Sequence, residues 1–227
     1  MLSDMAEPGS DQQFDSVFSR PQRRRRTQPA LTRERIVAAT IALLDREGAP
    51  GLTMRKVAAE LGVHATSLYW YVERREDLVD LAVDGILAEA AEVLPGPDTP
   101  WDTAVKVTAR RFYAALTAHT WAAEFAGSRP LIGPNAIALS RRIIGAIEQA
   151  GGEEEAQAIA IRALSNQILG AATSAVAVRV MRTGSSDRHD EVVASAVSAS
   201  DALAVENAYF DQVLDLVVEG IEARRGR

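Results

Sequence analysis

Residues 52–72 constrain the fold most, because they have the pattern of two short helices joined by a tight turn. Apolar side chains recur at i, i+3, i+4 and i+7, at Met54, Val57, Ala58 and Leu61, which places them on one face of a helix. Gly62 follows directly, and a glycine in the left-handed conformation commonly ends a helix. We therefore expect a short helix that stops at Gly62.

A second helix is predicted immediately after this turn. Thr66 and Ser67 suit its N-terminal end, because their hydroxyls can accept hydrogen bonds from backbone amides that lack a helical partner. Leu68 and Val72 lie one turn apart and face inward. Two helices joined by a short turn that contains glycine match a helix-turn-helix, whose second helix enters the major groove of DNA.

The charge distribution favours DNA binding, although the whole chain has a formal net charge of −6. Residues 20–76 carry twelve basic and six acidic side chains, whereas residues 77–227 carry thirteen basic and twenty-one acidic ones. The basic region coincides with the helix-turn-helix pattern, and neutralisation of phosphates dominates affinity for DNA. An acidic protein can therefore hold nucleic acid at one end.

The composition favours an all-α protein. Alanine is abundant, and no segment shows the alternation typical of a strand. The chain has no cysteine, which excludes disulfides, cysteine-based metal sites and a thiol nucleophile. Residues 1–20 lack the apolar core of a signal peptide, and the weakly polar run at 156–181 is too polar for a membrane span. We expect a cytoplasmic protein that does not enter a membrane.

Three regions are predicted along the chain. Residues 1–30 form a polar extension, which we expect to be disordered. Its four arginines at 23–26 are either an arm that reaches phosphates or the minor groove, or a solvated charge run. Residues 31–76 form the helix-turn-helix domain, and residues 77–227 form a larger helical domain. Helices are expected at 33–48, 54–61, 66–72, 74–93, 101–117, 119–126, 134–150, 153–182 and 201–225, and residues 190–200 are ambiguous.

Several blocks together resemble the DNA-binding domain of the tetracycline-repressor (TetR) family of bacterial transcriptional regulators. The blocks are residues 31–40, 43–48, 51–58, 61–63, 68–72 and 77–78, and the block 68–72 is similar to the tetracycline-repressor branch in particular. The resemblance implies a three-helix N-terminal domain and a C-terminal helical domain that binds a small molecule and forms a homodimer. It also implies a ligand-responsive repressor, released from a palindromic operator by a small molecule, rather than an enzyme.

The resemblance further implies which residues contact DNA. The base-reading candidates are Ala65, Thr66, Ser67 and Tyr71, and Thr53, Tyr69 and Arg75 match positions that commonly hold phosphates. Arg55 is the best candidate for a direct base contact, because arginine can pair with guanine through two hydrogen bonds. Ala65 could contact only a thymine methyl group. Trp70 is expected to pack against the first helix, and Tyr69 is expected on the surface.

The segment 124–130 resembles the turn in which tetracycline repressors hold a histidine ligand to drug-bound magnesium. Phe125 stands at that position here and cannot coordinate a hard cation, so we expect no metal and no other cofactor. Thr108 matches a polar pocket residue by a looser alignment, and Phe112 matches an aromatic one. We expect an apolar or aromatic effector. Its pocket is expected to be lined by residues from the set Trp101, Thr108, Phe112, Trp121, Phe125 and Met181. The alternative is that the aromatic residues of this set belong to the ordinary core.

Two long helices carry candidate dimer faces. One face is rich in small residues, at Ala160, Ala163, Leu164, Gln167, Ala171 and Ser174, and the other has Tyr209, Val213, Leu216, Val217 and Gly220. Two such pairs would form a four-helix bundle between subunits, and a two-fold protein reads a palindrome. Two other classes stay open: a helical enzyme or small-molecule carrier without a specific DNA target, and a nonspecific DNA-binding protein. The three histidines are scattered and no nucleophile motif occurs, which disfavours an enzyme.

Overall fold

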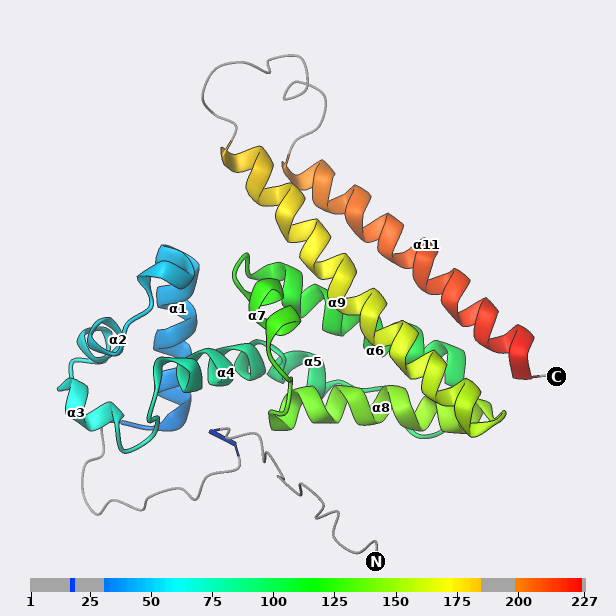
Figure 1. The fold of residues 1–227 in the computed structure, drawn as a ribbon, viewed down its shortest axis with the longest axis horizontal. Coiled ribbons are helices and arrows are strands. Elements are labelled where there is room, and N and C mark those ends of the chain that lie inside the picture. Colours follow the sequence, from blue (N-terminus) through cyan, green and yellow to red (C-terminus); the bar gives the residue numbers. More distant parts are fainter. Residues whose placement is uncertain (1–16, 19–30, 185–198, 226–227) are drawn as a thin grey trace, which may run out of the picture.

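The structure, a computed structural model, describes residues 17–18, 31–184 and 199–225 (Figure 1). Every regular element in these ranges is an α-helix, as the composition predicts. The arginine run at 23–26 and the ambiguous residues 190–198 lie outside the described residues. The helices are α1 (Arg33–Gly51), α2 (Met54–Glu60), α3 (Ala65–Leu68), α4 (Arg75–Ile86), α5 (Ala88–Glu92), α6 (Trp101–Ala118), α7 (Ala122–Ser128), α8 (Pro134–Ala150), α9 (Glu154–Gly184) and α11 (Ala199–Arg225).

Helices α1, α2 and α3 lie together at one end of the molecule, and local chemistry sets their boundaries (Figure 1). The hydroxyl of Thr32 accepts a hydrogen bond from the amide of Arg35, and the hydroxyl of Thr53 accepts one from Lys56, so each threonine caps a helix. Gly62 has φ 67°, a conformation that side chains disfavour, and it turns the chain from α2 toward α3. The predicted helix-turn-helix is therefore present.

Several predicted boundaries are wrong. The first helix continues past Gly48 to Gly51, with a kink where Gly48 has φ 67°. The predicted helix at 74–93 is divided at Leu87 into α4 and α5. The predicted helix at 119–126 begins only at Ala122, and α3 is a single turn that ends at Leu68.

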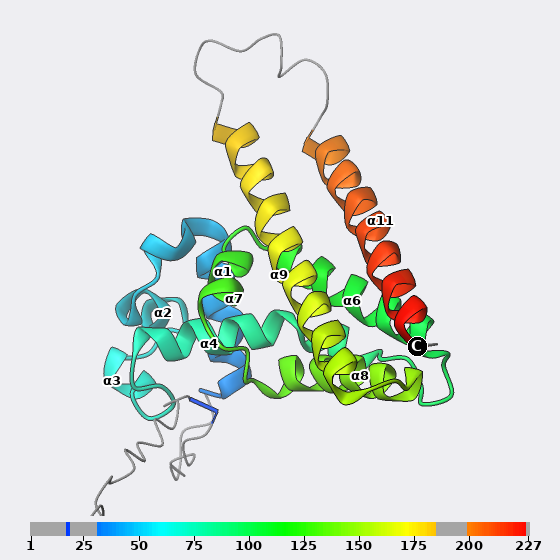
Figure 2. The same cartoon turned by 45° about the vertical axis from the view of Figure 1, so that its right-hand side comes forward.

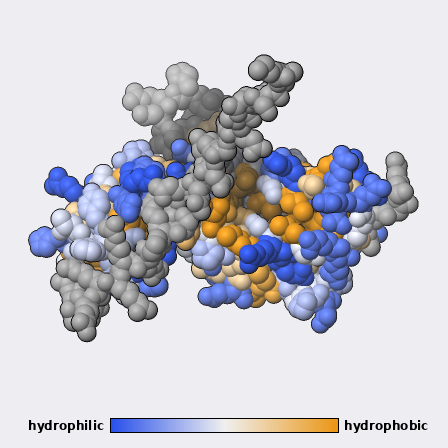
Figure 3. Space-filling view, turned by 60° about the horizontal axis from the view of Figure 1, so that its bottom comes forward, coloured by the Kyte–Doolittle hydropathy of each residue, from blue (hydrophilic) through white to orange (hydrophobic). Residues whose placement is uncertain are grey.

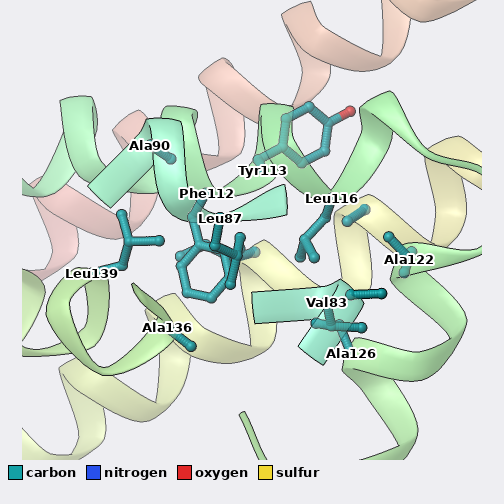
Figure 4. Close-up of a cluster of buried hydrophobic side chains, with 14 of the residues drawn as sticks. Val83, Leu87, Ala90, Phe112, Tyr113, Leu116, Ala122, Ala126, Ala136 and Leu139 are labelled. Carbon is teal, nitrogen blue, oxygen red and sulfur yellow. The ribbon is translucent and has the colours of Figure 1, made fainter. Parts of the chain in front are cut away.

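Helix α4 joins the two ends of the molecule. It packs against α1 on one side and against α7 and α8 on the other. The core of the larger domain is built where α4, α5, α6, α7 and α8 meet, and Figure 4 shows side chains from all five helices there. Val83, Leu87, Phe112, Leu116 and Leu139 are buried in this cluster.

Helices α9 and α11 lie side by side along one side of the larger domain, as both ribbon views show (Figures 1 and 2). Leu164, Ile168 and Leu214 are buried between them and the rest of the domain. The outer faces of these two helices carry exposed apolar side chains that no other described residue covers.

Two residues of the N-terminal extension are packed rather than exposed, contrary to the expectation of disorder across residues 1–30. Val17 is buried, and Phe18 packs against the core. The guanidinium of Arg33 lies 5.4 Å from the centre of the Phe18 ring, which is within the range of a cation–π contact. Hydrophobic periodicity could not predict this contact, because the two residues described here are too few to show a period.

Candidate functional site

The surface of the helix-turn-helix is presented by a small buried core. Leu68 and Val72 are buried as predicted, and Thr53, Arg55 and Thr66 are exposed. Ala65 and Ser67 are half-buried on the first turn of α3. Figure 3 shows that the end carrying this motif is mostly hydrophilic, whereas hydrophobic side chains gather over the larger domain.

Arg55 differs from the neighbouring cations in its contacts. Arg46 and Lys56 form ion pairs with Glu60 and Glu47, which tie α1 to α2. Arg55 is exposed and has no hydrogen-bond or ion-pair partner among the described residues. Its guanidinium is therefore available to a ligand without breaking an internal contact.

Tyr71 and Arg75 are held by backbone carbonyls. The hydroxyl of Tyr71 donates to the carbonyl of Leu31 at 2.6 Å. The guanidinium of Arg75 donates to the carbonyls of Leu52 (3.0 Å) and Ala49 (2.6 Å), which lie at the C-terminal end of α1. Both side chains therefore stabilise the domain, in addition to any contact with DNA.

The two aromatic residues after α3 are both on the surface. Tyr69 is 50% exposed, as predicted. Trp70 is 46% exposed, so the expectation that it packs in the core is wrong. Since α3 is only one turn long, Trp70 lies in the following turn and not on the buried face of a helix.

The larger domain contains a partly open pocket with a volume of about 430 Å³. Apolar side chains dominate its wall, and Ser128, Ser140 and Ser165 add hydroxyl groups. The lining residues come from α6, α8 and α9 and from the chain at the end of α7: Phe112, Ala126, Gly127, Ser128, Arg129, Pro130, Leu131, Ser140, Ile143, Ile144, Ile161, Ser165, Ile168 and Leu169.

Of the six predicted ligand-binding residues, the structure places only Phe112 in the wall of this pocket. Thr108 is fully buried, and its hydroxyl donates to the carbonyl of Ala104 within α6. Met181 is 71% exposed near the end of α9. Trp101 begins α6 and packs against the core.

Trp121 and Phe125 lie on another side of α7. Their ring centres are 6.4 Å apart, and the indole nitrogen of Trp121 donates to Asp45 of α1. Phe125 lines a small cavity with Asp80, Asp84 and Phe18. These aromatic residues therefore join the two ends of the molecule and do not face the larger pocket.

The residues missed by sequence reasoning are the pocket residues of α8 and α9. Ile144, Ile161 and Leu169 follow the same helical period as the core residues beside them. Their only local signal was the hydroxyl of Ser165 among apolar neighbours on α9. A residue that lines a cavity cannot be told from a core residue by periodicity alone.

Two carboxylates of α4 form hydrogen bonds to residues between Arg129 and Ala136, part of which forms the wall of the pocket. The guanidinium of Arg129 donates to both oxygens of Asp80, at 2.6 and 2.9 Å. This pair raises the pKa of Arg129, and Arg129 itself lines the pocket. One turn along α4, Asp84 accepts hydrogen bonds from the amides of Asn135 and Ala136 at the start of α8.

A third carboxylate connects α1 to the larger domain. Asp45 accepts the indole hydrogen bond from Trp121 at 2.7 Å, and the same oxygen lies 2.7 Å from Nδ1 of His119. Asp45 thus joins α1 to the larger domain, while Asp80 and Asp84 join α4 to the segment between α7 and α8 and to the start of α8.

Two classes of site have no counterpart in the described ranges. No helix there is long and apolar enough to cross a membrane. In the same ranges, no group of three or more histidine, aspartate or glutamate side chains is arranged to hold a metal ion.

A helix-turn-helix joined through one helix to a helical domain with a pocket defines a DNA-binding regulator with a ligand-binding domain. Family models agree with this class: "Bacterial regulatory proteins, tetR family" matches residues 36–82, and "Tetracyclin repressor-like, C-terminal domain" matches residues 94–225. The chain belongs to the TetR family of transcriptional regulators.

Individual relatives support the same assignment. An HTH-type transcriptional regulator of Saccharopolyspora erythraea is 39% identical over 160 residues, which cover 70% of this chain and 67% of that protein. The HTH-type transcriptional repressor DrrR1 of Streptomyces coeruleorubidus is 34% identical over 146 residues, covering 64% of this chain and 54% of that protein. Among solved structures, apo ActR from Streptomyces coelicolor superimposes with a TM-score of 0.67 at 26% identity, covering 87% of this chain and 99% of ActR.

Proposed function

We propose that the protein is a homodimeric repressor that binds a palindromic operator and is released when a small apolar or aromatic molecule enters the pocket beside Phe112. The observation that carries this proposal is the double role of Arg129. It lines the pocket and forms a two-point ion pair with Asp80 of α4, the helix that leads back to the helix-turn-helix. A ligand that moves the pocket wall would therefore move α4.

DNA recognition is assigned to the exposed part of the helix-turn-helix. Arg55 reads a base, because it is exposed and has no partner among the described residues. Thr66, with Ala65, Ser67 and Tyr71, completes the base-reading surface. Thr53, Tyr69 and Arg75 position the protein on phosphates, which fix register but carry no sequence information.

A homodimer is supported by the outer face of α11. Val205, Tyr209, Val213 and Leu216 recur at helical spacing and are between 38% and 66% exposed, so an apolar stripe remains uncovered in one chain. On α9 the face differs from the expected one, because Ala160 and Leu164 are buried within the protomer. A partner chain would cover the stripe and place two recognition helices on successive major grooves, about 34–36 Å apart.

The pocket indicates the class of effector. Its wall is mostly apolar with three serine hydroxyls, which suits a molecule with a hydrophobic body and few polar groups. ActR, a structural relative, has been solved in complex with actinorhodin, with a TM-score of 0.65, 25% identity and coverage of 87% of this chain and 99% of ActR. Ligand binding in that relative supports the same role for the pocket here.

Release would operate through two dimer conformations. The effector favours one of them only by its difference in affinity for the two, and DNA favours the other. Since Arg129 and Asn135 bond to α4 one turn apart, displacement of the segment 129–135 would tilt α4 and change the separation of the recognition helices.

The test is selection of a binding site from random duplex DNA, followed by gel retardation with the wild type and with Arg55→Ala. We expect Arg55→Ala to lose roughly 5- to 150-fold in affinity for the selected palindrome, the loss of about 1–3 kcal/mol typical of a base contact. Binding to random DNA should fall much less. Arg141→Ala, at an exposed arginine on α8, is the matched control and should leave both affinities unchanged.

The other classes give different results. A nonspecific DNA-binding protein would yield no enriched sequence, and a helical carrier or enzyme would retard no duplex at physiological salt. An equal loss on specific and random DNA would show that Arg55 contacts phosphate and not a base.

A further inference from the structure

The seam between α6 and α11 is held by two ion pairs placed one helical turn apart. Lys106 pairs with Asp215 at 2.7 Å, and Arg110 pairs with Asp211 at 2.6 Å. The order of the partners shows that the two helices run antiparallel along this seam. The next step of the ladder should bring Ala114 of α6 opposite Asn207 of α11.

At this position a cleft separates α6 from α11. Ala114 and Ala118 occupy the α6 positions that would continue the ladder, and neither side chain can reach across to α11. The result is a cleft with a volume of about 390 Å³. Its lining residues are Arg110, Tyr113, Ala114, Thr117, Ala118, Asn207, Phe210 and Asp211, none of which lines the pocket beside Phe112.

Tyr113 forms the inner wall of this cleft. Its ring stacks on Phe210, with ring centres 4.1 Å apart and planes 10° from parallel. Phe112 and Tyr113 are consecutive, and Figure 4 shows the tyrosine hydroxyl directed away from the apolar cluster that Phe112 enters. The two clefts therefore lie on different sides of α6.

The hydroxyl of Tyr113 is a buried polar group without a partner. The residue is 3% exposed, and its hydroxyl oxygen makes no hydrogen bond to any described residue. The hydroxyl of Thr117, another residue of the cleft lining, donates within α6 to the carbonyl oxygens of Tyr113 and Ala114. An unpartnered buried hydroxyl is costly, and in native proteins such a group usually meets water or a ligand.

The electrostatics of the cleft restrict what the hydroxyl can meet. Burial, together with the negative charges of Glu206 and Asp211, raises the pKa of Tyr113 to about 12. The hydroxyl therefore keeps its proton at physiological pH and offers it as a donor. The same two carboxylates disfavour an anion, and the one cation in the lining, Arg110, is paired with Asp211.

We propose that the cleft between α6 and α11 is a second small-molecule site, separate from the pocket beside Phe112, for a neutral planar molecule that presents a carbonyl oxygen to Tyr113. The carbonyl accepts the hydrogen bond from the tyrosine hydroxyl. The amide of Asn207 at the rim can pair with a second polar group of the ligand, and Phe210 supplies apolar surface.

The probe is benzamide, with benzoate as the matched anion of the same size and shape. The chain has four tyrosines, so a protein labelled with carbon-13 at the tyrosine ring carbon that bears oxygen gives four resonances. Single Tyr→Phe variants assign them. We expect benzamide to shift the Tyr113 resonance in a saturable way, to leave those of Tyr69 and Tyr71 unchanged, and to bind more tightly than benzoate.

Tyr113→Phe is the decisive variant, since it removes the hydroxyl and keeps the ring that stacks on Phe210. Its affinity for benzamide, measured from ligand relaxation, should fall about two- to tenfold, the loss expected for one neutral hydrogen bond. Thr103→Val, which removes an exposed hydroxyl near the start of α6 and outside the cleft, is the control and should bind as the wild type does.

Three results would overturn the proposal. The Tyr113 resonance could stay unshifted by benzamide up to its solubility limit, which would leave the cleft with a buried water only. Benzoate could bind as well as benzamide, which would exclude the neutral class. Tyr113→Phe, folded as judged by circular dichroism, could bind benzamide unchanged, which would place the ligand elsewhere.

Discussion

Asp84 is the clearest point at which one side chain holds the two ends of the molecule together. It lies on α4 and is 7% exposed. One carboxylate oxygen accepts the amides of Asn135 and Ala136, both at 3.0 Å, and the other accepts the side-chain amide of Asn135 at 3.1 Å. Asp84 therefore caps the N-terminus of α8 from a different helix, and its replacement should reduce the stability of the whole fold.

The expected loss follows from what Asp84→Ala leaves behind. The amide of Ala136, a residue that is 1% exposed, would lose its partner, and an unpartnered buried donor costs about 1–3 kcal/mol. The amide of Asn135 is less buried, so the loss of its partner costs less free energy. Removal of the buried Asp84 charge is favourable and offsets part of the total loss of stability. We expect about 2–3 kcal/mol. Asp84→Asn keeps one oxygen that can accept both amides, so we expect a loss within about 1 kcal/mol.

The assay is thermal and urea unfolding followed by circular dichroism, at one protein concentration because the proposed dimerisation would shift apparent stability. For a chain of this size, 1 kcal/mol corresponds to roughly 2–4 °C, so Asp84→Ala should melt about 4–12 °C below the wild type. Gly133→Ala should lower stability too, because a Cβ there would collide with the Asp84 carboxylate. Equal stability of Asp84→Ala and Asp84→Asn would refute the capping role.

Three further predictions concern the titration of Asp84, the proposed dimer interface and the cap of α2. Burial raises the pKa of the Asp84 carboxyl group, so the folded protein keeps the carboxyl proton at pH values where the unfolded chain has lost it. The free energy of unfolding of the wild type, relative to that of Asp84→Asn, should therefore fall as the pH rises from about 4 upward, as measured by urea titration. Leu216→Glu should give monomers in analytical ultracentrifugation and weaken binding to a palindrome but not to a half-site, and a wild-type dimer constant would count against the proposed interface. Thr53→Ala should lower stability by about 1 kcal/mol through loss of the cap on α2, and Thr53→Ser should restore it.

The parts of the fold that sequence reasoning found were those with local causes. Gly62 turns the chain after α2 because a left-handed residue is needed there. The buried positions Leu68 and Val72 followed from helical period. Each of these features depends only on neighbours along the chain.

The parts that were missed depend on partners distant in sequence. For Arg75, assigned to phosphate, no neighbour along the chain indicated that its guanidinium also bonds to two carbonyls at the end of α1, 23 and 26 residues earlier. Trp121 and Phe125 were assigned to the ligand, but they lie at the joint between α1 and the larger domain. An aromatic residue at such a joint has the same sequence signal as one in a pocket wall.

The three carboxylates at the joint also explain how an acidic charge balance and DNA binding coexist. Asp45 lies on α1, and Asp80 and Asp84 lie on α4, the helix that packs against α1; each is bonded to a residue of the larger domain. Their negative charge is thus compensated locally, by Arg129 and by backbone or ring donors. The same bonds connect α1 and α4 to the part of the molecule that forms the pocket. In the proposed dimer, a change in the pocket wall would alter the geometry of the DNA-reading surface without altering its charge, so the effector should act mainly on the spacing of operator half-sites that the dimer accepts.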